Sequence, residues 1–205
     1  MSGDGDLDAA VAALQGGGVV AIPTDTVYGL AVDPSVPGAT EALFALKARP
    51  PTVALPVLVA SPAALDDLGA PGDWLDAATR LADAFWPGAL TVVVPRRVGL
   101  DWDLGGTGDT VGLRCPDDDV ARLLCRRVGP LATTSANPHG LPPCHEAGAV
   151  RALFGDRLAL VLDDGPRDRP PSTVVALGPG GPRCLRTGAL AWERVLAVLA
   201  GPGPG

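Results

Sequence analysis

The sequence predicts an α/β (α+β-like) protein that folds as a single domain around a twisted, mixed parallel and antiparallel sheet. Short apolar runs rich in β-branched residues alternate with segments of helical periodicity, which favours an α/β architecture. Some of these runs are spaced for a hairpin and others are separated by a helix, so both pairing directions are expected. The 205 residues are 47% hydrophobic, which is ample for one core. We find no linker or internal repeat and expect one domain over residues 1–200, with 201–205 as a disordered tail.

The first part of the chain contains a helix followed by a buried strand. Asp6 or Asp8 can cap the helix, and the glycines that begin at Gly16 end it. The apolar run 19–22 has the length and β-branching of a buried strand, and Pro23 ends it because proline has no N–H to donate. The pattern then predicts a strand at 30–32, a helix at 38–47 and a strand at 55–60.

The middle of the chain continues the alternation. Ser61-Pro62 opens a short helix in the order of cap and then proline. Apolar residues at helical spacing predict an amphipathic helix at 73–85. A β-branched strand follows at 90–94, then a polar, glycine-rich loop at 96–109 that we expect to be mobile. A strand at 110–115 precedes a helix from the aspartates 117–119 to Arg127, whose charges suit the helix dipole at both ends.

In the last part of the chain, the sequence pattern predicts four strands and two helices. The expected strands are 131–134, 158–162, 172–176 and 184–186, and the expected helices are 145–154 and about 190–199.

Composition and charge exclude several classes of protein. The net charge of −7 argues against electrostatic binding of nucleic acid by the whole surface. The four cysteines form no C-x-x-C pair, which argues against zinc or a disulfide framework and favours thiols in a reducing compartment. The N-terminus lacks the pattern of a signal peptide, and no apolar run approaches the ~20 residues of a membrane span. We therefore expect a cytoplasmic chain with no membrane association.

A cluster of polar residues follows the first buried strand. Thr24, Asp25, Thr26 and Tyr28 come directly after Pro23. Polar groups at the end of a buried strand commonly build a small-molecule site, although an ordinary polar turn is the alternative.

Other predicted strands and helices also end in polar or cationic residues: Lys47, Arg49, Arg114, Ser135, Asn137, Ser172, Thr173 and Arg186. The chain has no phosphate-binding loop of Walker type, no dinucleotide fingerprint and no nucleophile elbow. Its two histidines leave few candidates for a triad or a metal cluster. Cationic groups and hydroxyls without a nucleophile predict a site that holds anions, as phosphoryl and nucleotidyl transfer require.

Seven motifs in order carry a resemblance to a known family: Pro-Thr-Asp-Thr-Val-Tyr-Gly-Leu at 23–30, Lys-x-Arg-Pro at 47–50, Phe-Trp-Pro-Gly-Ala-Leu-Thr at 85–91, Val-Gly-Leu-Arg-Cys-Pro at 111–116, Thr-Ser-Ala-Asn at 134–137, Ser-Thr-Val-Val at 172–175 and Leu-Arg-x-Gly at 185–188. Over residues 10–190 the chain resembles the YrdC-like family of threonylcarbamoyl-AMP synthases. The resemblance implies a YrdC-like fold, with helices and a mixed sheet around a deep basic cavity.

The resemblance also implies a nucleotidyltransferase activity. L-threonylcarbamoyladenylate synthases join L-threonine, bicarbonate and ATP into threonylcarbamoyl-AMP and release pyrophosphate. Mg²⁺ would accompany ATP. The product would pass to a threonylcarbamoyl-transferase complex for the N6-threonylcarbamoyl modification of adenosine in tRNA. We expect a standalone enzyme.

Roles carried over by matching position assign two groups of residues and no metal ligand. The threonine-binding residues would be Thr26, Tyr28, Arg114, Thr133 and Ser172. The ATP-binding residues would be Lys47, Arg49, Thr110, Ser135, Asn137 and Arg186, with Lys47 and Arg49 also catalytic.

The chain departs from the family pattern at Val53, Leu58, His139 and Pro143. These departures leave the nucleotide affinity and the strictness for the acceptor amino acid open. One alternative is a related carbamoyl-adenylate-forming enzyme of a maturation or secondary-metabolite pathway, although such enzymes usually carry fused domains. Another is a non-catalytic RNA-binding or ribosome-maturation module, which the acidic balance and scarce aromatic residues disfavour.

Overall fold

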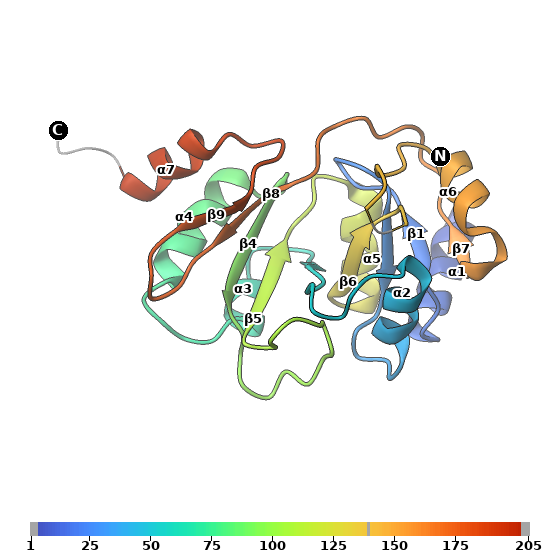
Figure 1. The fold of residues 1–205 in the computed structure, drawn as a ribbon, viewed down its shortest axis with the longest axis horizontal. Helices are drawn as coiled ribbons and strands as arrows, with labels where there is room; N and C mark the ends of the chain where they lie inside the picture. Colours follow the sequence, from blue (N-terminus) through green and yellow to red (C-terminus); the bar gives the residue numbers. More distant parts are fainter. Residues whose placement is uncertain (1–3, 139, 202–205) are drawn as a thin grey trace.

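The computed structural model of the chain describes residues 4–138 and 140–201, and within them it has one nine-stranded sheet in the order β7-β1-β2-β6-β3-β5-β4-β8-β9 (Figure 1). His139 and the predicted tail, apart from Gly201, lie outside the described residues. The strands are β1 (Val20–Ile22), β2 (Gly29–Val32), β3 (Val57–Leu58), β4 (Leu90–Pro95), β5 (Thr110–Arg114), β6 (Leu131–Ser135), β7 (Leu160–Val161), β8 (Thr173–Ala176) and β9 (Arg183–Arg186).

The pairing directions confirm the predicted mixed sheet. Strands β1 and β7, β3 and β5, and β4 and β8 pair in parallel. The remaining neighbours, including the β8–β9 hairpin, pair antiparallel. The hairpin spacing of the last two strands and the longer connections elsewhere account for this mixture.

The helices lie close to the segments that periodicity predicts. They are α1 (Asp4–Gln15), α2 (Ala39–Lys47), α3 (Ala64–Leu68), α4 (Leu75–Phe85), α5 (Asp119–Val128), α6 (Ala147–Phe154), the short 3₁₀ turn η1 (Gly155–Arg157) and α7 (Trp192–Ala200). Asp118 caps α5 by accepting a hydrogen bond of 2.9 Å from the backbone N–H of Ala121. None of the helices in the described part of the chain has the length and apolarity that a membrane crossing requires.

The core is divided into two clusters, which take alternate residues of the same strands. Val20 and Ile22 of β1 belong to a smaller cluster with Leu14 of α1 and Leu124 of α5. Ala21, between them, belongs to the larger cluster that also contains residues of α2, α4 and α6. A strand covered on both faces has apolar residues at every position, which explains the uninterrupted run that predicts β1.

Two predicted strands are much shorter in the structure than in the sequence pattern. The run 55–60 pairs only at Val57–Leu58, and the run 158–162 only at Leu160–Val161. Backbone hydrogen bonds to the neighbouring strands continue beyond these pairs: the N–H of Val59 donates to the carbonyl of Arg114 at 2.9 Å, that of Ala159 to Val19 at 2.9 Å and that of Leu162 to Ala21 at 3.0 Å. Loop 96–109 has no helix or strand, and Leu104 within it is buried in the larger cluster. The two predicted runs thus lie along their neighbouring strands, and only the regular pairing is shorter than predicted.

Candidate functional site

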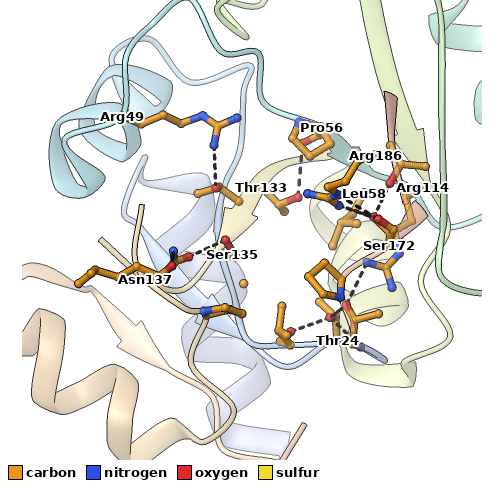
Figure 2. A pocket seen from close by; sticks show the side chains of 18 residues that line it. Thr24, Arg49, Pro56, Leu58, Arg114, Thr133, Ser135, Asn137, Ser172 and Arg186 are labelled. Carbon is orange, nitrogen blue, oxygen red and sulfur yellow. Dashed lines mark hydrogen bonds between the residues drawn. The ribbon is translucent and has the colours of Figure 1, made fainter. Parts of the chain in front are cut away.

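A cavity of about 230 Å³ lies where the ends of several strands meet. Its wall includes three arginines, and Figure 2 shows Arg49 on one side of the cavity with Arg114 and Arg186 across from it. Seven hydroxyl residues also line it: Thr24, Thr26, Thr91, Thr133, Thr134, Ser135 and Ser172. No carboxylate occurs among the lining residues that the structure describes. The cavity therefore suits anionic ligands.

Arg114 ends strand β5 and makes contacts with three different partners. Its Nη2 donates to Oδ1 of Asp25 at 2.5 Å, its Nη1 to Oγ1 of Thr26 at 3.2 Å and its Nε to the carbonyl of Gly88 at 3.0 Å. Burial lowers the pKa of Arg114, and the negative charge of Asp25 opposes that shift. The guanidinium of Arg114 is thus held in one position, and the carboxylate of Asp25 balances its positive charge.

Arg49 and Arg186 have only neutral partners among the described residues. Arg49 donates to the carbonyls of Val53 at 2.9 Å and Ala54 at 2.8 Å. Arg186 donates to the carbonyl of Ser172 from Nε at 3.1 Å and from Nη2 at 2.8 Å. Burial lowers the pKa of each, and the charge of Arg186 lowers that of Arg49 further. Two cations that line one cavity and repel one another favour a shared polyanionic ligand.

Lys47 lies behind the cavity wall. It is the last residue of α2, is 2% exposed and does not line the cavity. Its ammonium donates to the carbonyl of Ser135 and, at 3.1 Å, to Oδ1 of Asn137. Burial, with a smaller contribution from the charge of Arg49, lowers the pKa of Lys47 to about 8. Lys47 therefore holds the Ser135–Asn137 turn of the wall.

The hydroxyls of the wall are held by one another and by the backbone. Thr24 Oγ1 donates to the carbonyl of Val27 at 2.7 Å and lies 3.1 Å from Oγ1 of Thr26. Ser172 Oγ lies 2.9 Å from Oγ1 of Thr91. Thr133 Oγ1 donates to the carbonyl of Pro56 at 3.4 Å, and the backbone N–H of Thr133 donates to the same carbonyl at 2.8 Å. These bonds fix the hydroxyl positions without a ligand.

The structure does not bring Tyr28 and Thr110 to the cavity. Tyr28 is fully buried, and its O–H donates to the carbonyl of Gly165 at 2.8 Å and accepts from the N–H of Asp164 at 3.3 Å. Thr110 is exposed at the start of β5, paired with Pro95, while Arg114 is at the strand's other end. The positions of these two residues do not support the expected substrate contacts, whereas the other nine predicted residues line the cavity or, like Lys47, contact its wall.

Sequence reasoning assigned no role to Asp25, Thr91 and Thr134. Thr91 and Thr134 line the cavity, and Asp25 is the buried partner of Arg114. All three residues stand inside motifs that the sequence singles out, so their positions were visible although their contacts were not.

Of the residues that depart from the family pattern, Leu58 and Pro143 line the cavity. Leu58 stands directly opposite Arg114 in the parallel register of β3 and β5. Val53 is exposed and contributes only its carbonyl to Arg49. His139 lies outside the described residues.

Comparison with known proteins identifies relatives over nearly the whole chain. A family model described as Sua5_yciO_yrdC, telomere recombination, matches residues 12–188. A Mycobacterium tuberculosis protein named as a candidate threonylcarbamoyl-AMP synthase is 42% identical over 191 residues, covering 93% of this chain and 87% of that protein. The threonylcarbamoyl-AMP synthase of Pseudomonas aeruginosa is 41% identical over 148 residues, covering 71% of this chain and 78% of that protein.

Solved structures share the fold. P. abyssi Sua5 in complex with L-threonine superposes with a TM-score of 0.87 at 33% identity, covering 94% of this chain and 56% of that one. This chain therefore spans little more than half of that Sua5. E. coli YciO superposes with a TM-score of 0.80 at 22% identity, covering 89% of this chain and 88% of that one, which supports the fold alone. Since the family model spans well over half of the chain and these relatives align along most of it, the chain belongs to the Sua5/YciO/YrdC family.

Proposed function

We propose that this protein is an L-threonylcarbamoyladenylate synthase, which forms threonylcarbamoyl-AMP and pyrophosphate from L-threonine, bicarbonate and ATP. The observation that carries the proposal is the division of positive charge within one cavity. Arg49 and Arg186 have no carboxylate partner among the described residues, whereas Arg114 is paired with Asp25. The names of the relatives and the threonine complex of P. abyssi Sua5 support the substrates.

Arg49 and Arg186, which have no carboxylate partner among the described residues, suit the triphosphate of ATP. Arg49 and Arg186 would hold phosphate oxygens, since a guanidinium offers a planar fork of donors to phosphate. Ser135 and Asn137, fixed by Lys47, also line the cavity and would provide further contacts to ATP. ATP would enter as its magnesium complex. Because the lining has no carboxylate and the described residues include no group of three His, Cys, Asp or Glu able to hold a metal, phosphate oxygens and water would be the ligands of the ion.

Arg114, whose charge is balanced by Asp25, suits the amino-acid substrate. Arg114 would receive the carboxylate of threonine, with the hydroxyls of Thr26 and Ser172 and the backbone of Thr133 around it. The amino group condenses with bicarbonate and releases water, which gives an N-carboxylated threonine. Its new carboxylate oxygen then attacks the α-phosphorus, and the bond to pyrophosphate breaks. Two anions must meet in this step, so the cationic wall lowers the barrier by charge neutralisation and positioning.

The proposed product would be consumed in tRNA modification. A threonylcarbamoyl-AMP would be passed to a threonylcarbamoyl-transferase complex in the cytoplasm. The acidic net charge of −7 is consistent with such a transfer without direct binding of tRNA.

Pyrophosphate release from ATP by the purified protein tests the proposal. We expect release that requires both L-threonine and bicarbonate, with threonylcarbamoyl-AMP detected by mass spectrometry. Release that requires carbamoyl phosphate in place of threonine would favour a carbamoyl-adenylate-forming enzyme. No release with any of these substrates would contradict an adenylate-forming activity.

A further inference from the structure

A buried carboxylate lies behind the arginine of the proposed threonine subsite. The side chains of Asp25 and Arg114 are 5% and 8% exposed, and their contact of 2.5 Å joins β5 to the turn after β1. Asp25 is absent from the lining of the cavity but borders a separate cleft, together with Asp117 and Arg169. The carboxylate of Asp25 therefore acts on a ligand in the cavity only by way of Arg114.

The contacts of Arg114 leave a defined set of donors. A guanidinium has five N–H groups. Asp25, Thr26 and Gly88 each take one N–H, from Nη2, Nη1 and Nε respectively. One N–H on each terminal nitrogen remains, and Arg114 lines the cavity. Two N–H groups on neighbouring nitrogens can receive a carboxylate with both of its oxygens.

We propose that Asp25 is a positioning residue that fixes Arg114 to receive the carboxylate of the amino-acid substrate. The inference rests on the proposed function, because it assigns the acceptor subsite to Arg114. Without Asp25 the guanidinium would be a buried cation with only hydroxyl and carbonyl partners, which is costly, so it would turn toward solvent.

The same pairing separates the two ligands of the cavity. Arg114 with its charge balanced by Asp25 attracts a triphosphate less than Arg49 and Arg186 do, since neither has a carboxylate partner among the described residues. Asp25 thereby favours binding of ATP at Arg49 and Arg186 and leaves Arg114 for the singly charged carboxylate.

Kinetics of Asp25 variants test this role. Asp25→Ala should raise the KM for threonine by about tenfold or more while changing the KM for ATP and kcat by less than about threefold. Asp25→Asn keeps an oxygen that accepts from Nη2, so it should recover part of the loss. Asp117→Asn is the matched control, because Asp117 borders the same cleft but its side chain is 62% exposed and does not contact Arg114.

Calorimetric titration of each variant with L-threonine alone separates binding from turnover. An unchanged threonine KM and affinity in a folded Asp25→Ala protein, or an equal rise in the ATP KM, would overturn the role of Asp25. If Asp25→Ala fails to fold, the same comparison between Asp25→Asn and the wild type decides. If the wild type shows no threonine-dependent release of pyrophosphate, the proposed function and this inference are both wrong. If the wild type is active and the Asp25 variants are unaffected, only the inference is wrong.

Discussion

The ammonium of Lys47 lies 3.1 Å from Oδ1 of Asn137, and both residues are buried. Ser135 completes the group, because its carbonyl accepts from Lys47 and its hydroxyl donates to the same oxygen of Asn137 at 2.5 Å. A cation from the end of α2 thus holds two polar residues of the wall in one arrangement. This relationship gives Lys47 a measurable effect on stability.

The stability supplied by Lys47 should depend on pH. Its pKa is about 8 in the folded protein and about 10.4 in an unfolded chain. Between these values the unfolded chain binds more protons, so stability rises with pH; below pH 8 the cost of burying the charge is fully present. We expect the free energy of unfolding of the wild type, relative to Lys47→Met, to rise by about 2 kcal/mol between pH 7.5 and 10. Urea denaturation measures it, and a difference independent of pH would contradict the prediction.

Arg186→Ala should weaken the binding of ATP more than the binding of threonine. The variant removes one of two cations without a carboxylate partner among the described residues, and a lost charge-assisted contact to phosphate corresponds to about 10- to 100-fold in the KM for ATP. Arg183→Ala is the control, since Arg183 lies on the same strand β9, is exposed and does not line the cavity. Steady-state kinetics with each substrate varied in turn measure both constants. Equal effects of the two variants would contradict a specific role for Arg186.

Arg114→Ala should have the opposite selectivity. It removes the proposed partner of the threonine carboxylate and leaves Asp25 as an unpaired buried charge, so stability should also fall by about 3 kcal/mol or more. We expect the threonine KM to rise more than the ATP KM, measured under conditions in which circular dichroism confirms the fold. A larger rise in the ATP KM would mean that the two subsites are interchanged.

Tyr28→Phe should affect stability and not catalysis. The hydroxyl donates to the carbonyl of Gly165 and lies outside the cavity, so its loss should cost about 1 kcal/mol of unfolding free energy. The threonine KM should change by less than about threefold. A tenfold rise in that KM with unchanged stability would show that Tyr28 contacts the substrate after all.

The sequence predicts the elements better than the side-chain directions. Periodicity and prolines locate the strands, because burial on both faces leaves apolar runs such as 19–22, and Pro23 lacks a donor. Thr110 and Arg114 belong to one predicted strand, yet four residues at about 3.3 Å each place them at opposite ends of it. A motif match alone did not show that only Arg114 reaches the cavity.

Tertiary contacts account for the other differences. Lys47 ends a helix, where a lysine is commonly solvated, but the turn of β6 packs over it. Tyr28 offers a hydroxyl in the motif, but residues from a distant loop use that hydroxyl. The hydrogen-bond partners of Lys47 and Tyr28 are distant in sequence, so no local sequence pattern predicts them.

The tether from Tyr28 to Gly165 spans 137 residues of sequence, and the Lys47–Asn137 and Arg114–Asp25 contacts span 90 and 89. Closing loops of that length costs entropy before the contacts form, so the cavity cannot assemble from any local segment of the chain. Partial unfolding near any one wall would then abolish binding outright. Substrates should therefore protect amides throughout the sheet from hydrogen exchange, by the mass-action stabilisation of the native state as a whole.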